Sequence, residues 1–517
     1  MQLSTLFQKP SGWVLACFLC SSGGFLFGID TGIIGPVTVM EDFTEYVGNP
    51  SPTIHGLIVS SILIPAAISS FFAGRVGDAL GRPRGIAIGS FIFGAGAALE
   101  GASIHIAMFI VGRIIEGIGE GLYISMLIVY ICEISPPRYR GALTTGPQLL
   151  TTLGLVTGFF TCYGSTNIKS SLSWRLPFIL LAAFSLVFCA AALAWLPPSP
   201  RCLTLRGMTE EAAEAWEKLD VPTADREKIL DQYETTVVET AVPDASGART
   251  GPVTSAVVPP PKTRKAELLD VFSSDARPRL FLAVFLMGMQ QLSGIDGLLY
   301  YAPLLFQQAG LSSNESTFLA SGVSAIVIFA VTIPATLLAD KWGRRLNTIL
   351  GGLGMAGTMF LMGSLYAGDA VHASTGAGRW IVILCIYVFA VLYCVTWAVG
   401  VKVYAAEIQP QRTRASATSI AHGSNWLANF LVALVTPTLL AETSYGAYFL
   451  FGGCTFLTAV VCWVFMPETL GLSLDEIDGA FRGSHRRVSG FKELARSLRR
   501  RVLRRRMPAA VDVDLDA

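Results

Sequence analysis

The chain has 517 residues, of which 52% are hydrophobic and 15% are charged, and its formal net charge is +1. Soluble domains carry about 25% charged residues, so this composition excludes an ordinary soluble protein. It indicates a protein that spends most of its length in a membrane.

Twelve apolar runs follow one another along the chain, and each approaches the roughly 20 residues that cross a bilayer as a helix. They cover approximately 13–35, 54–74, 85–104, 106–130, 143–164, 175–196, 280–306, 316–338, 347–367, 379–405, 417–438 and 447–466. No cleavage site resembling A-x-A follows the first run, so we expect a retained helix rather than a signal peptide. The sequence therefore predicts an all-α membrane protein with twelve transmembrane helices.

The positive charges divide unevenly between the loops. If the first helix starts in the cytoplasm, the outer loops contain Lys169, with Arg175 and Arg379 at their borders, and no other lysine or arginine. By the positive-inside rule, both termini are expected in the cytoplasm. The sequon at Asn314 then lies in an outer loop and predicts a glycosylation site.

Three sequence features recur at a nearly constant offset, which indicates a six-helix unit written twice. They are GRVGDALGRPRG with LADKWGRRLN, EISPPRYRGA with EIQPQRTRAS, and LPPSPR with MPETLG. We therefore expect an N-terminal half at 1–196 and a C-terminal half at 280–466. Paired six-helix halves with a substrate site between them are an architecture of transporters.

The remaining segments are cytoplasmic in this topology. The linker 197–279 is expected to contain a short amphipathic helix, TEEAAEAWEKL, and a disordered insert at 240–263. The tail 467–517 is basic, and 482–506 is read either as a helix on the anionic inner leaflet or as a solvated positive tail. Nucleic-acid binding is not expected of it.

Asp30 lies in the middle of the apolar stretch GGFLFGIDTGIIG. A carboxylate in hydrocarbon costs roughly 2.5–3.5 kcal/mol on insertion scales. We therefore expect Asp30 to have a function.

Taken together, the motifs resemble one family, the sugar porters of the major facilitator superfamily, over roughly residues 20 to 480. The matching motifs are GIDTGIIG, GDALGRPR, GRIIEGIGEGLYISMLIVYICEISPPRYRG, SWRLPF, PPSPR, QQLSGIDGLLYYAP, DKWGRR, EIQPQRTRA, NWLANF and PETLG. The resemblance implies the major facilitator fold and secondary transport by alternating access.

The resemblance places Asp30 at the protonatable aspartate of proton-coupled sugar porters, with Arg113 as its partner. Burial favours the neutral acid while the guanidinium favours the carboxylate, so such a group can take up a proton outside and release it inside. Alternatively, the two form a permanent ion pair that holds helices 1 and 4 together. Glu116 and Glu120 replace small or apolar residues of the family, and either could compete for Arg113 or form a second relay.

The resemblance also implies a set of sugar ligands. Amides suit vicinal hydroxyls, because they donate and accept at once, and aromatic rings cover the apolar face of a pyranose. In the alternative reading, paired glutamines satisfy one another between helices. The matching residues are Phe27, Gln148, Gln290, Gln291, Tyr300, Tyr301, Asn425 and Trp426.

Two pocket positions depart from the family pattern. Asp296 stands where the family has asparagine, and Lys402 stands at a tryptophan position. The two either neutralise each other as a buried pair, or Lys402 receives the carboxylate of an acidic substrate such as a uronate or a quinate-like acid. His422 is read as a packed helix residue near this pocket.

Acidic and basic residues recur at the cytoplasmic ends of helices in both halves. Carboxylate–guanidinium pairs there can form and break between two states and latch the outward-open form, or they serve only to anchor the topology. The expected latch residues are Asp78, Arg82, Glu133, Arg140, Asp340, Arg344, Glu407 and Arg414.

The sequence thus predicts a proton-driven importer of a sugar or of a sugar-like polyol or acid. An exporter of a secondary metabolite or small organic acid, and a nutrient sensor that binds without turnover, are the alternatives. No enzyme is expected, since GIGEG (117–121) imitates a nucleotide loop but lies inside a spanning helix. We expect no cofactor and no metal, and a functional monomer in the plasma membrane whose partners are the solute, the proton and the bilayer.

Overall fold

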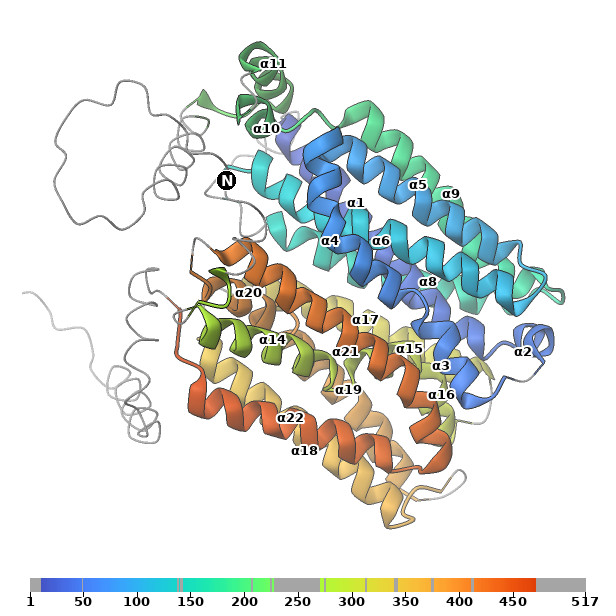
Figure 1. The fold of residues 1–517 in the computed structure, drawn as a ribbon. Helices are drawn as coiled ribbons and strands as arrows, with labels where there is room; N and C mark the ends of the chain where they lie inside the picture. The colour runs from blue at the N-terminus through green and yellow to red at the C-terminus, as the bar shows by residue number, and fades with distance from the viewer. Residues whose placement is uncertain are drawn as a thin grey trace, which may run out of the picture.

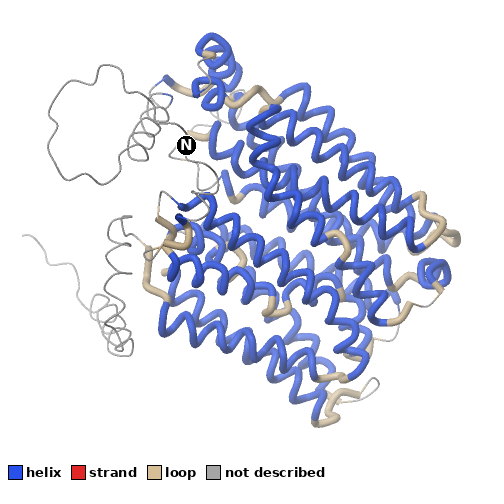
Figure 2. The backbone as a smooth tube through the Cα atoms, in the orientation of Figure 1, coloured by secondary structure: helices blue, strands red, loops and turns tan. Residues whose placement is uncertain are grey.

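The computed structural model describes residues 11–470 except 227–269 and short gaps at 49, 137–138, 140–142, 206–207, 224–225, 274–275, 312–313, 339–342, 373–375 and 411–412. Every regular element in the described residues is a helix (Figure 2). The predicted disordered insert and the basic segment 482–506 lie outside the described residues.

The N-terminal half contains long helices that follow the apolar runs. Because α3 and α4 are separated by only two residues, Ser61 and Ile62, they form one span. Its helices are α1 (Gly12–Thr38), α2 (Glu41–Val47), α3 (Pro52–Ser60), α4 (Leu63–Leu80), α5 (Arg82–Gly101), α6 (Ile106–Ile134), α8 (Gly146–Ser165) and α9 (Leu172–Trp195).

The C-terminal half has two spans whose helix is interrupted. The first breaks at Gly294, which has a left-handed φ of 88° and begins α15, and the second breaks after Trp397. Its helices are α14 (Arg277–Gln291), α15 (Ile295–Tyr300), α16 (Ala302–Gln308), α17 (Asn314–Leu338), α18 (Arg344–Ala367), α19 (Gly378–Thr396), α20 (Gly400–Glu407), α21 (Arg414–Glu442) and α22 (Gly446–Phe465). Each break frees backbone groups that side chains must satisfy inside the membrane.

Ten described segments are long and apolar enough to cross a membrane. The other two spans are α5 and α8, which are each 20 residues long. The charged residues Arg82, Arg84 and Glu100 lower the hydropathy of α5, and glycines and threonines lower that of α8. Both helices are nevertheless packed into the bundle, α5 against α6 and α9 and α8 against α1 and α17. The predicted fold of twelve transmembrane helices is therefore confirmed.

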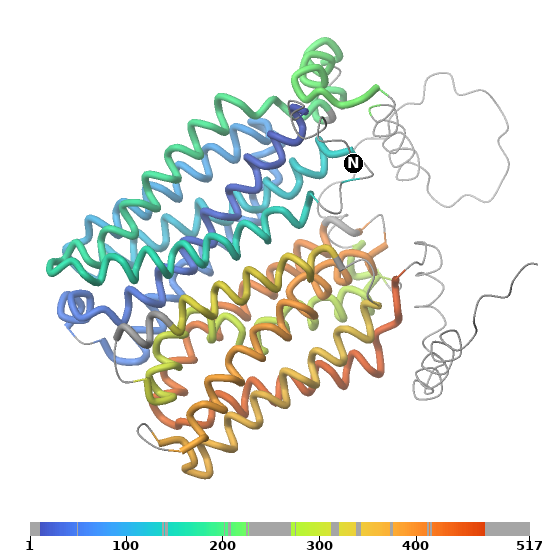
Figure 3. Tube along the Cα trace, turned by 180° about the vertical axis from the view of Figure 1, so that it is seen from behind, coloured from blue at the N-terminus to red at the C-terminus, as the bar shows by residue number. Residues whose placement is uncertain are grey.

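The helices group into two bundles that lie side by side along their length (Figures 1 and 3). One hydrophobic core is built mainly from α1–α9 and the other mainly from α14–α22. Two short helices, α10 (Pro200–Leu205) and α11 (Thr209–Leu219), follow the first bundle, and α11 coincides with the predicted amphipathic helix.

The two bundles touch closely at the end where α2 and α3 lie, opposite to α10 and α11 (Figure 1). A Cβ atom on Gly35 of α1 would lie 2.2 Å from the Tyr300 carbonyl oxygen, and one on Gly56 of α3 would lie 2.2 Å from the Leu434 carbonyl oxygen. These glycines therefore allow backbone-to-backbone contact between the halves at this end.

Candidate transport site

The buried ion pair that the sequence predicts between α1 and α6 is present. Arg113 Nη1 donates a hydrogen bond to Asp30 Oδ1 at 2.6 Å. Asp30 is 3% exposed and Arg113 is 1% exposed. Glycines permit the tight packing of α1, since a Cβ atom on Gly28 would lie 2.0 Å from the carbonyl oxygen of Thr151 in α8.

Three further carboxyl groups surround the same guanidinium. Arg113 Nη1 also donates to Glu116 Oε2 at 2.9 Å and lies 3.7 Å from Glu100 Oε2. Glu120 lies one turn beyond Glu116, and neither of its oxygens has a hydrogen-bond partner among the described residues. The sequence reasoning missed Glu100, although a single acid in the apolar run 85–104 was a visible signal.

We call these five residues the Arg113 cluster: Asp30, Glu100, Arg113, Glu116 and Glu120. All are at most 3% exposed, and an isolated buried charge is strongly unfavourable. One guanidinium balances one carboxylate, so electrical neutrality requires the other three carboxyls to carry protons. The arrangement can therefore hold and exchange protons.

An amide network joins α14 to α21 in the C-terminal half. Gln290 Nε2 donates at 2.8 Å to the Trp397 carbonyl, which lies at the break between α19 and α20 and also accepts a 3.4 Å bond from the Val401 amide. Asn425 Nδ2 donates to Gln290 Oε1 at 3.2 Å and to the Met287 carbonyl at 2.8 Å. Gln291 Nε2 donates to Asn425 Oδ1 at 3.2 Å.

The two glutamines differ in what they leave free. Gln290 is fully buried, and both ends of its amide are bonded to protein, but the partners are the Trp397 carbonyl and Asn425 and not Gln291. Gln291 keeps Oε1 without a partner among the described residues. In this conformation Gln291, and not Gln290, has a free oxygen that could accept a hydrogen bond from a solute hydroxyl.

The neighbouring tyrosines occupy different positions. Tyr300 OH accepts a weak hydrogen bond from Asn429 Nδ2 at 3.4 Å. Tyr301 OH donates to the Ala433 carbonyl at 2.6 Å, and its ring packs edge-on against His55 of α3 in the other half. Tyr301 thus belongs to the contact between the halves. Asn429 was missed, although it lies one turn after Asn425 on the same face of α21.

Charged groups lie beside this network. Asp296 lies next to Gln291, and its charge interacts with that of Lys402, but no ion pair within 4 Å joins the two in the described part of the chain. Both side chains are half-buried. His422 is also within electrostatic reach of Lys402, and its Nδ1 makes a 3.0 Å hydrogen bond to the Thr418 carbonyl.

The other expected sugar ligands come from both halves. Gln148, in the first turn of α8, is half-buried and makes no hydrogen bond to any described residue. Phe27 of α1 is also half-buried, and Trp426 of α21 packs against the core of the N-terminal half. All three side chains are only partly buried, and Trp426 lies at the contact between the halves.

Ion pairs recur at corresponding helix ends of the two halves. Arg82 Nη2 lies 2.9 Å from Asp78 and 3.4 Å from Glu133, and Arg344 Nη2 lies 3.5 Å from Glu407. Each of these pairs lies within one half. The predicted residues Arg140 and Asp340 lie outside the described residues, and the side chains of Arg414 and Asn314, which begin α21 and α17, are likewise not described.

Sequence reasoning also missed Glu468, which caps α18. Its Oε1 accepts a hydrogen bond from the Arg344 amide at 2.7 Å, and its Oε2 accepts one from the Arg345 amide at 3.2 Å. The sequence analysis identified the motif PETLG, which contains Glu468, but it did not predict that Glu468 binds the first turn of α18.

Comparison with known proteins decides the family. The model of the family described as sugar (and other) transporter matches residues 16–481. The chain belongs to this transporter family.

Curated transporters of the family match along almost the whole chain. The chain is 30% identical over 487 residues to the low-affinity glucose transporter HXT3 of Saccharomyces cerevisiae, which covers 90% of this chain and 82% of that protein. It is 30% identical over 488 residues to the sugar transport protein MST7 of Oryza sativa subsp. japonica, covering 90% of each.

Solved transporter structures match the fold. The inward-open xylose transporter XylE from E. coli has a TM-score of 0.72 and 25% identity, over 90% of this chain and 99% of XylE. The proton:xylose symporter XylE bound to 6-bromo-6-deoxy-D-glucose has a TM-score of 0.72 and 26% identity, over 91% and 99%. The chain is accordingly a multi-pass membrane transporter and not an enzyme.

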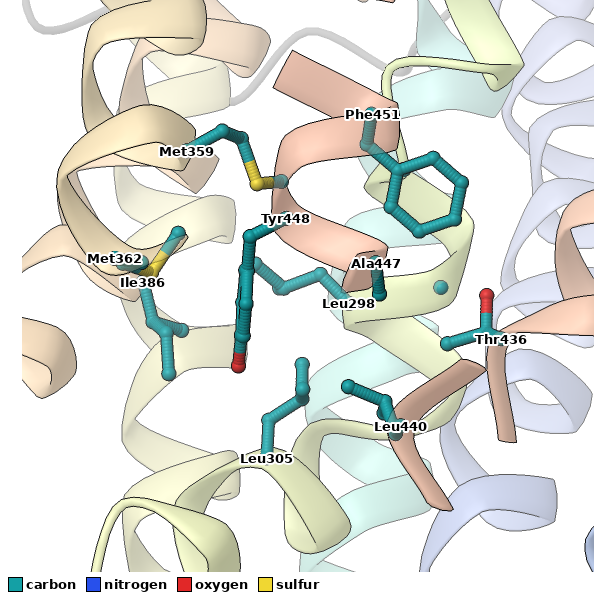
Figure 4. A pocket seen from close by; sticks show the side chains of 12 residues that line it. Leu298, Leu305, Met359, Met362, Ile386, Thr436, Leu440, Ala447, Tyr448 and Phe451 are labelled. Atoms are coloured by element: carbon teal, nitrogen blue, oxygen red, sulfur yellow. The ribbon is translucent and has the colours of Figure 1, made fainter. Parts of the chain in front are cut away.

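A small cavity in the C-terminal half of this transporter is separate from the amide network (Figure 4). Its volume is about 20 Å³, and a water molecule needs about 10–15 Å³. The cavity is therefore too small for a sugar. Most of its lining is apolar and includes Leu298, Met359, Met362, Tyr448 and Phe451.

Proposed function

We propose that the chain is a symporter that couples proton entry to the import of a sugar, or of a sugar-like polyol or acid. The observation that carries the proposal is the ion pair between Asp30 and Arg113, at 2.6 Å on two different helices of one half. Buried pairs of this kind are weak stabilisers compared with an apolar replacement, so a role in transport accounts for the pair better than a role in stability. The neighbouring XylE structures are those of a proton:xylose symporter, and the curated relatives include glucose transporters, which supports the same function.

In the proposed cycle, a proton from outside neutralises Asp30 and weakens its hold on Arg113. This changes which packing of the two halves is preferred, because protonation and solute binding each favour one state. Gln291, Gln148 and the aromatic residues near the junction hold the solute. The ion pairs of Arg82 and Arg344 then strengthen or loosen at the cytoplasmic ends as the halves rock.

The proposed topology places both termini in the cytoplasm. It follows that the end where Gly35 and Gly56 contact the other half is the outer end, and this conformation is closed to the outside. We further propose that the transporter acts as a monomer in the plasma membrane.

The test is uptake of labelled solutes by transporter-deficient cells, with hexoses, pentoses, uronates and quinate compared at two external pH values. Wild-type uptake should rise at the lower pH and should concentrate its substrate. Asp30→Asn should abolish this accumulation and retain counterflow exchange, because exchange needs no proton. Uptake that ignores pH, or an Asp30→Asn variant that accumulates as the wild type does, would contradict proton coupling.

A further inference from the structure

The contacts of Arg113 point beyond a single aspartate. Asp30 and Glu116 both contact the same nitrogen, Nη1, at 2.6 and 2.9 Å, and they approach it from two different helices. A guanidinium can therefore keep a close counter-ion when either carboxyl is neutral, without any movement of α1 against α6. Both acids are at most 3% exposed, so solvent does not supply the counter-charge for Arg113.

Glu100 completes the arrangement from α5. Neither oxygen of Glu100 accepts a hydrogen bond from a described donor, and the same is true of Oε1 of Glu116. The two carboxyls nevertheless lie within hydrogen-bonding reach of each other. A proton on either carboxyl turns this contact into a hydrogen bond.

Glycines of α5 and α6 build this contact. A Cβ atom on Gly96 would lie 2.4 Å from the Glu116 amide nitrogen, and one on Gly112 would lie 2.7 Å from Glu100 Cγ. Any larger residue at either position would force the two helices apart. The close approach of α5 and α6 is thus what brings the two glutamates together.

We propose that Glu116 is the alternate counter-ion of Arg113, and that Glu100 and Glu116 share a proton in a hydrogen bond in which Glu100 is the donor once Glu116 is a carboxylate. This inference rests on the proposed proton coupling and names a positioning residue for it. When Asp30 takes up a proton from outside, Glu116 releases its own proton toward the cytoplasm and becomes the carboxylate that balances Arg113. When Asp30 later passes its proton to Glu116, the cluster returns to its first state and one proton has moved through.

The surroundings of the cluster contain few other titratable groups. Within the described residues, Tyr123 of α6 lies near Glu120, and Tyr300 of α15 lies within electrostatic reach of Asp30 and Glu120. Arg75 and Asp78 of the adjacent α4 are exposed at its far end. The exchange therefore takes place among the carboxyls themselves.

The first test is the pH profile of Glu116→Gln. Without Glu116, protonation of Asp30 leaves Arg113 with only the more distant Glu100 carboxyl at 3.7 Å, so half-maximal accumulation should require an external pH lower by about one unit. Glu120→Gln is the comparison variant, because it removes an equally buried carboxyl of the same cluster and helix that makes no ion pair with Arg113 among the described residues, so its shift should be smaller than that of Glu116→Gln. An unchanged profile in Glu116→Gln, with normal pH dependence in the wild type, overturns the inference and leaves the proposed function standing.

The second test does not depend on transport. In the purified full-length protein, Asp30→Asn and Glu116→Gln should each lower the thermal midpoint only slightly, since Arg113 stays paired. The double variant should lose several degrees more than the sum of the two, and adding Arg113→Gln should restore the loss. Additive single effects overturn the inference, even if wild-type uptake proves independent of pH. If the double variant does not fold, a folded triple variant supports the inference and an unfolded one overturns it.

Discussion

At the scale of the residue, Lys402 is a charged side chain close to Asp296, which itself lies beside the amide network. It is a half-buried ammonium group that interacts with the charge of Asp296 without a contact within 4 Å in the described residues. A cation held in this way costs free energy inside a membrane unless an anion approaches it. A substrate carboxylate would supply that anion, which is why sugar acids belong in the panel of solutes.

The variant Lys402→Met tests this role. If Lys402 binds a carboxylate, uptake of uronates should fall about tenfold relative to hexoses, because a hydrogen bond to a charged group contributes about 1.5–3 kcal/mol. Lys402→Arg, which keeps the charge, is the control and should retain uronate uptake. Equal changes for acids and neutral sugars would favour the pairing with Asp296 instead.

Only some residues of the candidate site could be predicted from the sequence. Asp30 and Arg113 could be paired because the resemblance to the sugar porters links two motifs that lie 83 positions apart. Glu100 could not, since its contact with Glu116 depends on how closely α5 and α6 approach at their glycines. The different hydrogen bonding of Gln290 and Gln291 was equally hidden, because it depends on where the break between α19 and α20 places the Trp397 carbonyl.

At the scale of the element, glycine determines how closely the spans pack. Apolar length alone was enough to predict the spans, but not the interruptions at Gly294 and after Trp397, because the apolar runs continue through them. At many glycines a side chain would collide with the backbone of a neighbouring helix, which accounts for the absence of one. On α8, a Cβ atom at Gly154 would lie 2.3 Å from the Phe25 carbonyl oxygen of α1, while one at Gly164 would meet nothing within 4 Å.

These two glycines of α8 provide a matched pair of variants. Gly154→Ala should separate α1 from α8, lower the thermal midpoint by several degrees and impair transport. Gly164→Ala should be neutral or slightly stabilising, because alanine favours a helix by roughly 0.5–1 kcal/mol over glycine. The thermal midpoint of purified protein measures both, and similar effects of the two substitutions would contradict the packing argument.

At the scale of the whole molecule, the two halves meet through backbone contacts at one end. Gly56 of α3 lies against the Leu434 carbonyl of α21 in the other half. Since this contact joins the halves and not the helices within a bundle, it belongs to one conformation of the transporter. A substitution there should shift the balance between conformations more than it weakens either bundle.

Gly56→Trp should therefore prevent closure at this end. We expect transport to stop, the distance between spin labels placed on α3 and α21 to lengthen, and thermal stability to change little. The control is Gly453→Trp, because a Cβ atom at Gly453 of α22 meets nothing within 4 Å. Unaltered label distances in Gly56→Trp would contradict the assignment of this contact to a single state.

The Arg113 cluster lies wholly among α1, α5 and α6, whereas the amide network joins α14 to α21 at the break between α19 and α20. If Gln148 and Phe27 of the N-terminal half act together with that network, one bundle contains the proton site and both bundles hold the solute. Evolution could then alter solute specificity through α14 and α21 without changing the groups that bind the proton.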